Sequence, residues 1–432
     1  NDDIVFPDIE TSEDCLFLNV FTPSLNESSK NESSNGAPVM VWIHGGALFV
    51  GSGADDPPQN LAAKGVVVVT INYRLGLFGY FAHPDLNGTN FGLQDQVKAL
   101  EWVKNNIADF GGNPDQVTIF GESAGAGSVL ALMVSPLSEG LFAGAIAESA
   151  APNESLDISM SEAGKVGLAL GDALNISAGS DQLDEMRARP WEDIVDVNEQ
   201  MFSESKNAMS NIYVDNYSMD ASIYDSFMQG LNHKVPLLLG TNANETAMFG
   251  AMGNATETTV GEYQDMVKAE FTNEEDADKV LADFPATTDE EAWGASVQVG
   301  TAQIFGGPDY YIAESLANRS EPVFFYHFTQ VPDGADGDKL GAFHTSEIPY
   351  VFRDDSIGII SNPDLADTMQ AYWVQFARSG DPNEESLPQW PAFDGTNWQI
   401  LGPQVENAEI PSEYVELYDL GRSSFVASLD QL

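Results

Sequence analysis

The stretch TIFGESAGAGSV, residues 118–129, decides the fold. Apolar residues before Gly121 predict the end of a buried strand, and the small residues after Ser123 predict the start of a helix. Between them, Gly121 to Gly125 match GxSxG, a sharp strand-to-helix turn that exposes the hydroxyl of its serine. Glycines two residues to either side leave room where side chains would collide. The stretch therefore predicts a nucleophilic serine at Ser123, held at a helix N-terminus that favours an oxyanion.

Strand and helix patterns alternate on both sides of this turn. The unbroken β-branched run at 66–71 is typical of a strand covered on both faces, as in a parallel sheet between helices. Apolar residues at helical spacing predict a helix over 93–110, which the sequence GGNP then stops. The alternation predicts an α/β fold with a mostly parallel, twisted sheet. The strand candidates are 39–43, 66–71, 116–120, 235–240 and 321–328.

The chain shows no internal repeat and no interdomain linker. We expect a single domain over residues 1–432, with helical insertions at about 155–230 and 250–320 that form the substrate pocket. The polar, low-complexity segment 24–37 is interpreted as a loop between strands.

Charge and hydropathy exclude several classes of function. The chain carries 67 acidic and 17 basic residues, a net charge of −50, so its surface repels nucleic acid and anionic lipid. Adaptation to a salty environment is the favoured interpretation, and an ordinary acidic secreted protein is the alternative. No apolar run is long enough for a membrane span. The N-terminal residues lack the pattern of an export signal, so we expect that any such signal is absent or already removed, with a secreted or periplasmic location slightly favoured.

A nucleophilic serine needs a base, and five histidines are available. His44 opens HGGALF directly after a strand, so it fits a loop whose backbone amides stabilise an oxyanion better than it fits the base. His344 follows late in the chain, in a short loop between apolar segments, where the order Ser, acid, His places the base. The others, His83, His233 and His327, lie in turn-like or strand sequence. For the orienting acid, Glu245 follows a buried strand and is a candidate, although a solvated loop glutamate is the alternative.

These residues resemble the type-B carboxylesterase and cholinesterase family of α/β hydrolases. The matching blocks span most of the chain in the family's order, and GESAG together with NIADFGGNPDQVTIF is specific. The blocks are EDCLFLNVFTP (13–23), VWIHGGALFVGSG (41–53), INYRLGLFGY (71–80), NFGLQDQVKALEWVKNNIADFGGNPDQVTIFGESAGAGSV (90–129), GTNANETAMF (240–249), FHTSEIPYVF (343–352) and WVQFARSGDPN (373–383).

The resemblance implies an α/β-hydrolase fold and a serine carboxylesterase that works through an acyl-enzyme without metal or cofactor. It implies Ser123 as nucleophile, His344 as general base and acid, and Glu245 as the acid that orients the imidazole. The oxyanion hole would be the backbone amides of Gly46, Ala47 and Ala124. Three further positions, Gly45, Glu122 and Ser149, match residues that line or support the site, with packing as the alternative for Glu122 and Ser149.

The chain also departs from the family's pattern. The family usually has a longer N-terminal segment, whose cysteine pairs with the one matching Cys15 and whose tryptophan holds quaternary ammonium in cholinesterases. That segment also supplies the lid of fungal lipases, and Val5 stands at about the place of the tryptophan. Choline esters and long-chain triglycerides are therefore both less expected. Three small substitutions, Ala47, Thr246 and Ala150, stand where glycine is usual.

The expected substrate is a small-molecule ester with a small to medium acyl chain. Two alternatives stay open: a non-catalytic, cholinesterase-like binding protein, and a lipase, thioesterase or amidase that uses the same site. The oligomeric state and the preferred acyl and alcohol groups are not decided by the sequence.

Overall fold

The computed structural model describes most of the chain. The described residues are 11–23, 36–86, 88–152, 160–177, 179, 181–205, 211–253, 257–271 and 273–429. Val5 and most of the predicted loop at 24–37 lie outside them.

A nine-stranded sheet forms the centre of the molecule, in the order β1-β3-β2-β4-β5-β6-β7-β8-β9. The strands from β3 to β8 pair in parallel, and only the outermost strands β1 and β9 pair antiparallel. The strands are β1 Leu18–Phe21, β2 Ala37–Ile43, β3 Val67–Ile71, β4 Gly112–Glu122, β5 Gly144–Glu148, β6 Leu237–Asn242, β7 Val323–Phe328, β8 Asn397–Leu401 and β9 Val405–Glu409. The predicted mostly parallel sheet is confirmed, because buried β-branched and aromatic side chains on both faces require cover on both sides.

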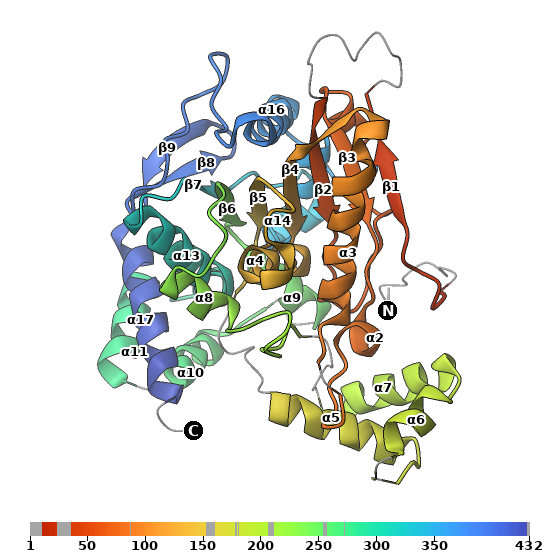
Figure 1. The fold of residues 1–432 in the computed structure, drawn as a ribbon. Coiled ribbons are helices and arrows are strands. Elements are labelled where there is room, and N and C mark those ends of the chain that lie inside the picture. Colours follow the sequence, from red (N-terminus) through yellow and green to blue (C-terminus); the bar gives the residue numbers. More distant parts are fainter. Residues whose placement is uncertain are drawn as a thin grey trace.

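Helices cover both faces of this sheet (Figure 1). One face, which carries Val41, Ile119 and Leu239, packs with α3, α4 and α13. The opposite face, which carries Trp42 and Phe120, packs with α15 and α16. The helices are α1 Gln59–Ala62, α2 Gly76–Tyr80, α3 Phe91–Asn106, α4 Ala124–Val134, α5 Met160–Ala173, α6 Gln182–Arg187, α7 Trp191–Ser205, α8 Ile223–Gln229, α9 Glu245–Met252, α10 Val260–Glu270, α11 Glu274–Asp283, α12 Asp289–Thr301, α13 Gly307–Asn318, α14 Ala335–Leu340, α15 Ile348–Phe352, α16 Pro363–Ser379 and α17 Ser412–Leu429.

The helix predicted over 93–110 starts two residues earlier and ends sooner. It is α-helical to Asn106 and then tightens into a 3₁₀ turn, Ile107–Phe110. Gly111 ends this turn at φ 86°, a left-handed conformation that glycine adopts without steric cost.

Two sets of helices interrupt the alternation of strand and helix. Helices α5 to α8 lie between β5 and β6, and α9 to α13 lie between β6 and β7. Helices α5, α6 and α7 group at one end of the molecule, around a small apolar cluster of their own that includes Leu170 and Ile194 (Figure 1). None of the helices in the described ranges has the length and apolar character of a membrane span.

Candidate active site

Ser123 lies on the turn between β4 and α4, as the GxSxG pattern predicts. Its φ of 57° and ψ of −124° are far from the helical values of the next residue, so the turn is strained. A Cβ on Gly125 would come 2.0 Å from the carbonyl oxygen of Ile43, and one on Gly121 would come 2.5 Å from the same atom. The two glycines are therefore required because the elbow presses against the end of β2.

The loop after β2 holds two backbone amides in fixed directions. The oxygen of Gly45 lies 2.9 Å from His44 Nδ1, and the oxygen of Gly46 accepts hydrogen bonds from the amides of Phe49 and Val50. In a trans peptide the N–H points opposite to the C=O, so these contacts orient the amides of Gly46 and Ala47. A Cβ on Gly45 would lie 3.2 Å from the Cβ of Ser123, which places this loop beside the serine.

Gly46 and Ala47 both adopt left-handed conformations, with φ values of 96° and 55°. Gly46 has to be glycine, since a Cβ there would lie 2.2 Å from the oxygen of Val50. Ala47 keeps its backbone conformation at a steric cost of roughly 1 kcal/mol. The alanine in place of the usual glycine is therefore accommodated without reshaping the loop.

His44 is a structural residue of this loop, and its contacts give it no part as a base. Its ring is buried and stacks on Tyr73 at 4.5 Å, and the Tyr73 hydroxyl donates to the His44 oxygen over 2.8 Å. Burial lowers the pKa of His44, so the ring is neutral near pH 7.

Glu245 and His344 meet at the carboxyl ends of β6 and β7. An isolated bridge between Asn244 and Phe343 brings the two segments together. His344 Nδ1 then lies 2.7 Å from Glu245 Oε2, and both side chains are buried. The other oxygen of Glu245 accepts hydrogen bonds from the Ser149 hydroxyl over 2.5 Å and from the Asn242 amide over 2.7 Å. Glu245 is thus held in one orientation.

The other ring nitrogen of His344 faces a second carboxylate. Nε2 lies 3.3 Å from Oε1 of Glu122, the residue before Ser123. Among the described residues, no hydrogen bond joins the Ser123 hydroxyl to His344. The imidazole also packs against the rings of Phe249 and Phe305, which stack on each other, at 5.0 and 5.1 Å between centroids.

The two carboxylates determine the charge on His344. Burial alone would lower its pKa, but Glu122 and Glu245 outweigh burial and raise the pKa to about 9. Burial in turn raises the pKa of Glu122 well above its usual range, although the neighbouring imidazole opposes that shift. Near neutral pH one proton is therefore held between Glu122 and His344.

Other histidines take no part in this arrangement. His83 contacts Gln182, His233 contacts the oxygen of Ser135, and His327 stacks on Trp398 at 4.1 Å.

Three buried acids near the site were not predicted from the sequence. Glu148 is the last residue of β5, Glu347 precedes α15, and Asp309 lies in α13 with its Oδ2 3.4 Å from the Ala150 amide. Of these three acids, only Glu148 has a signal in the sequence that could have identified it. It is an acidic residue at the last position of a strongly apolar strand.

Thr246 and Ala150, the two other residues that stand where glycine is usual in the family, both lie near the site. The Thr246 hydroxyl donates to the oxygen of Val297 over 3.0 Å, which ties α9 to α12. Ala150 lines the cavity described next.

A cavity of about 380 Å³ opens beside Ser123. None of its lining side chains is charged, and most are apolar or aromatic. The elbow and the loop after β2 form its floor. Its walls are residues 211–214, Met219, residues 221–224, Phe249 and Phe305. Phe305 belongs to a π-helical turn, Ala302–Gly306, a rare distortion that is frequent at functional sites. Residues of both helical insertions thus line this cavity, and their role as a substrate pocket stays a prediction.

No cluster of three or more metal-ligating side chains is arranged to bind a metal ion in the part of the chain that the structure describes.

Comparisons with known proteins place this geometry in a family. The model of the carboxylesterase family matches residues 2–416. The chain is 35% identical to fumonisin B1 esterase of Sphingopyxis macrogoltabida, over 92% of this chain and 74% of that protein. It is 34% identical to para-nitrobenzyl esterase of Bacillus subtilis (strain 168), over 88% and 77%, and 36% identical to human cocaine esterase, over 90% and 72%.

The fold has a close match among solved structures as well. A PNB esterase structure superimposes with a TM-score of 0.77 at 30% identity, covering 94% of this chain and 84% of that one. The chain therefore belongs to the carboxylesterase family of α/β hydrolases and is a serine hydrolase of carboxylic esters.

Proposed function

We propose that this single-domain enzyme hydrolyses uncharged esters with small to medium acyl chains through an acyl-enzyme, and that it works in a salty environment. Ser123 is the nucleophile, His344 the general base and acid, and Glu245 the acid that orients the imidazole. The observation that carries the proposal is the 2.7 Å contact of His344 Nδ1 with a fully buried Glu245, next to a strained serine elbow.

The first step forms the acyl-enzyme. His344 Nε2 takes the proton of the Ser123 hydroxyl as the serine oxygen attacks the ester carbonyl, and the same proton then passes to the leaving alcohol. Nε2 must leave Glu122 for this hydrogen bond, and such bonds often tighten only when substrate closes the site. Glu245 stays ionised and stabilises the imidazolium that forms.

Three backbone amides stabilise the oxyanion of the tetrahedral intermediate. The amides of Gly46 and Ala47 are oriented by the loop after β2, and the amide of Ala124 is the first of α4, where a helix leaves its N–H groups unpaired. The loss of one such donor costs about 3 to 4 kcal/mol of the barrier. Water repeats the attack on the acyl-enzyme, with His344 again as base, and the acid is released.

The cavity supports the choice of substrate. Its volume of about 380 Å³ and its uncharged lining suit an apolar acyl or alcohol group. A charged group there would be buried without a partner, at a cost of several kcal/mol. We therefore expect neutral esters to exceed their carboxylate analogues in kcat/KM, and the rate to fall once the acyl chain outgrows the cavity.

The decisive experiment replaces the nucleophile. Ser123→Ala is expected to reduce kcat for p-nitrophenyl acetate on the order of 10⁶-fold, with fold and melting temperature retained. An organophosphate probe should label wild-type Ser123 covalently and leave the variant unlabelled.

The matched control is Ser128→Ala, one turn further along α4, whose buried hydroxyl accepts a hydrogen bond from Gln96. This variant should keep its esterase activity. Hydrolysis by the Ser123 variant well above background would refute the mechanism, and a well-folded protein that no probe labels would point to a binding function.

A further inference from the structure

Three buried acids lie together behind the imidazole of His344. Glu122 is the last residue of β4 and Glu148 the last of β5, and the two are register partners in the parallel ladder. Partners in neighbouring parallel strands project to the same face of the sheet, about 4.8 Å apart. Glu347, at the N-terminus of α15, completes the group, and all three side chains are buried. These three residues are called the acid cluster below.

Each acid has one oxygen without a hydrogen-bond donor among the described residues. Glu148 Oε1 accepts from the Trp373 indole over 2.8 Å, and Glu347 Oε2 accepts from the side-chain amide of Asn242, whose backbone N–H is the group that donates to Glu245. Glu148 Oε2, Glu347 Oε1 and Glu122 Oε1 receive no hydrogen bond, although the last contacts His344. Three ionised carboxylates in this arrangement would repel one another and would be poorly solvated. A proton on one of the three carboxylates reduces the repulsion, because it removes one negative charge. It also supplies a hydrogen-bond donor to a neighbouring carboxylate oxygen.

The surroundings identify which acid holds that proton. Burial raises the pKa of Glu122 and Glu347 too, to about 7 for Glu347, but the positive charge of His344 opposes that shift in both and favours their ionised forms. Among the described residues, no cation interacts with Glu148. The groups that face it are Glu122 on β4, Glu347 before α15, the Trp373 indole on α16, the Tyr326 phenol on β7 and Asp56. Burial and these acids raise its pKa well above the usual range.

We propose that Glu148 is a positioning residue that works in its protonated form: its Oε2 donates a hydrogen bond within the acid cluster and so holds Glu122 and Glu347 in place behind His344. The Trp373 indole occupies Oε1 and thereby leaves Oε2 to carry the proton. Besides Glu245 at Nδ1, the negative charge that His344 experiences then comes from Glu122 and Glu347, and the ionisation of these two depends on the donor at Glu148. The proposal rests on the proposed role of His344 as the base.

Two substitutions separate a proton donor from a charge. Glu148→Gln is neutral, accepts from Trp373 through its amide oxygen and donates through its NH₂ group, so it reproduces the protonated acid. Glu148→Leu has similar bulk and no donor. In the leucine variant Glu122 and Glu347 lose a stabilising hydrogen bond and become easier to protonate, so His344 loses its proton more readily. The acid limb of the kcat/KM profile should therefore move to lower pH by about one unit in Glu148→Leu and stay at the wild-type position in Glu148→Gln.

The pH profile is measured for wild type, both variants and Glu139→Gln, an exposed glutamate shortly before β5 that serves as control. An acid limb that moves equally in the glutamine and leucine variants would overturn the proposal, because Glu148 would then act as a charge. Identical limbs in all four proteins would also overturn it.

A spectroscopic readout does not depend on esterase activity and covers the case in which the leucine variant fails to fold. Infrared spectra of the wild type at pH 7 should contain the carbonyl band of a protonated carboxylic acid that Glu148→Gln lacks and Glu139→Gln retains. If that band is the same in Glu148→Gln as in wild type, Glu148 is ionised and the proposal is wrong, whatever the protein hydrolyses.

Discussion

At the scale of single residues, the proposed base His344 lies between two acids, which have opposite effects on the proposed mechanism. Glu245 fixes the ring through Nδ1, whereas Glu122 lies 3.3 Å from Nε2, the nitrogen that has to accept the serine proton. The base is active only in its neutral form, and the pKa of His344 is raised to about 9. We therefore expect the acid limb of kcat/KM to lie well above pH 6.5, with activity still rising through pH 8.

Glu122→Gln should move this limb to lower pH, by about one unit, because it removes a carboxylate that stabilises the imidazolium. The measurement is kcat/KM against pH for p-nitrophenyl acetate. A limb that stays in place or moves to higher pH would contradict the role given to Glu122.

The same group links catalysis to stability. Because the pKa of His344 is higher in the folded protein than its ordinary value of 6.5, its protonation contributes fully to stability below pH 6.5. That contribution is lost as the pH rises toward 9, so the catalytically active form of the histidine is the one that stabilises the fold less.

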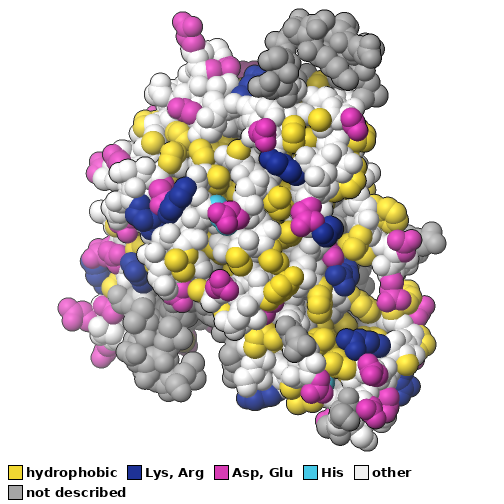
Figure 2. All heavy atoms as spheres, in the orientation of Figure 1, with side chains coloured by type: hydrophobic (Ala, Val, Ile, Leu, Met, Phe, Trp, Pro, Cys, Tyr) yellow, Lys and Arg dark blue, Asp and Glu magenta, His cyan; other side chains and the backbone are white. Residues whose placement is uncertain are grey.

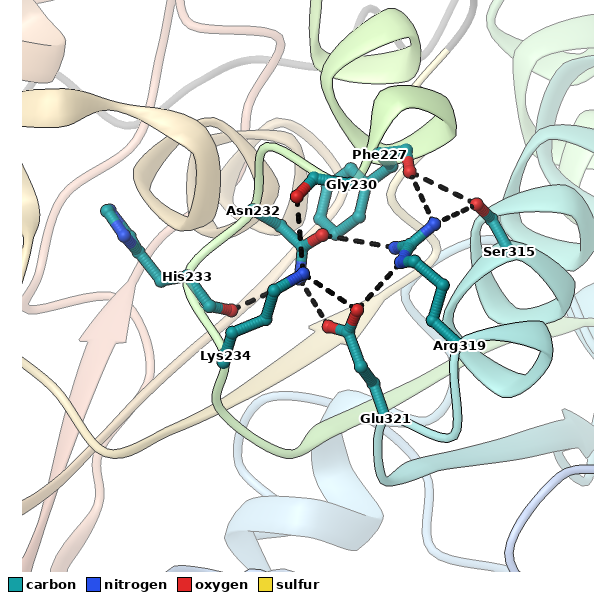
Figure 3. A network of polar contacts seen from close by, with 8 residues as sticks. All are labelled: Phe227, Gly230, Asn232, His233, Lys234, Ser315, Arg319 and Glu321. Atoms are coloured by element: carbon teal, nitrogen blue, oxygen red, sulfur yellow. Dashed lines mark hydrogen bonds and ion pairs between the residues drawn. The ribbon is translucent and has the colours of Figure 1, made fainter.

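At the scale of secondary-structure elements, a polar network fixes α8, which carries cavity residues Ile223 and Tyr224, against α13 (Figure 3). The Arg319 guanidinium donates to the oxygen of Phe227 over 3.0 Å, to Ser315 over 2.6 Å, to Asn232 over 3.1 Å and to Glu321 over 2.7 Å. Lys234 joins the network through Glu321, over 2.8 Å, and through the oxygen of Gly230. Cationic side chains thus satisfy carbonyls at the C-terminus of α8, where the helix dipole favours positive charge.

Arg319→Met should reduce the free energy of unfolding by about 2 kcal/mol, since it leaves the largely buried Glu321 and the end of α8 short of donors. Chemical denaturation measures this loss. Arg187→Met is the control: its ion pair with Asp184 is exposed, and its loss should change stability by less than about 0.5 kcal/mol.

The loss of stability in Arg319→Met should depend on pH, because the network changes the pKa of Glu321. Burial would raise the pKa of Glu321, but hydrogen bonds from Lys234, Arg319 and Asn232 lower it below its ordinary value of 4.5. A lowered folded pKa means that the contribution is complete above about pH 4.5 and fades as the pH falls through the folded value. The difference between wild type and Arg319→Met should therefore shrink in acid. A difference that persists undiminished below the folded pKa would contradict an ionic origin.

At the scale of the whole molecule, the net charge of −50 is the main electrostatic feature. Acidic side chains are spread over the face shown in Figure 2, and basic ones lie singly among them. Their mutual repulsion opposes the compact state unless counterions screen it, with a Debye length of about 10 Å at 0.1 M salt and about 3 Å at 1 M.

The melting temperature should therefore rise with NaCl into the molar range, and esterase activity should persist there. Calorimetry in NaCl, KCl and sucrose tests this, because the two salts screen charge equally and sucrose acts by exclusion from the protein surface. A flat or falling melting temperature in both salts would reject the halophilic interpretation, and an equal rise in sucrose would show that screening is not its cause.

Local sterics and composition are what the sequence determined by itself. The glycines around Ser123 and at Gly46 are required by contacts within a single turn or with the end of one neighbouring strand, so the motifs alone predicted both features. The alternation of buried strands with amphipathic helices predicted the parallel sheet for a similar, local reason. The spacing of apolar residues within each element indicates which of its faces is buried. The net charge follows from the numbers of acidic and basic residues in the sequence.

Tertiary structure alone decided the electrostatic environment of the imidazole. Glu122 and Glu148 become neighbours only through the register of β4 and β5, and Glu347 reaches them from a helix that follows a distant strand. The cavity walls likewise come from two insertions whose own patterns are simply helical. The physical reason is that a carboxylate's pKa and a cavity's shape depend on what lies within a few ångströms in space, and only the packed sheet brings those groups together.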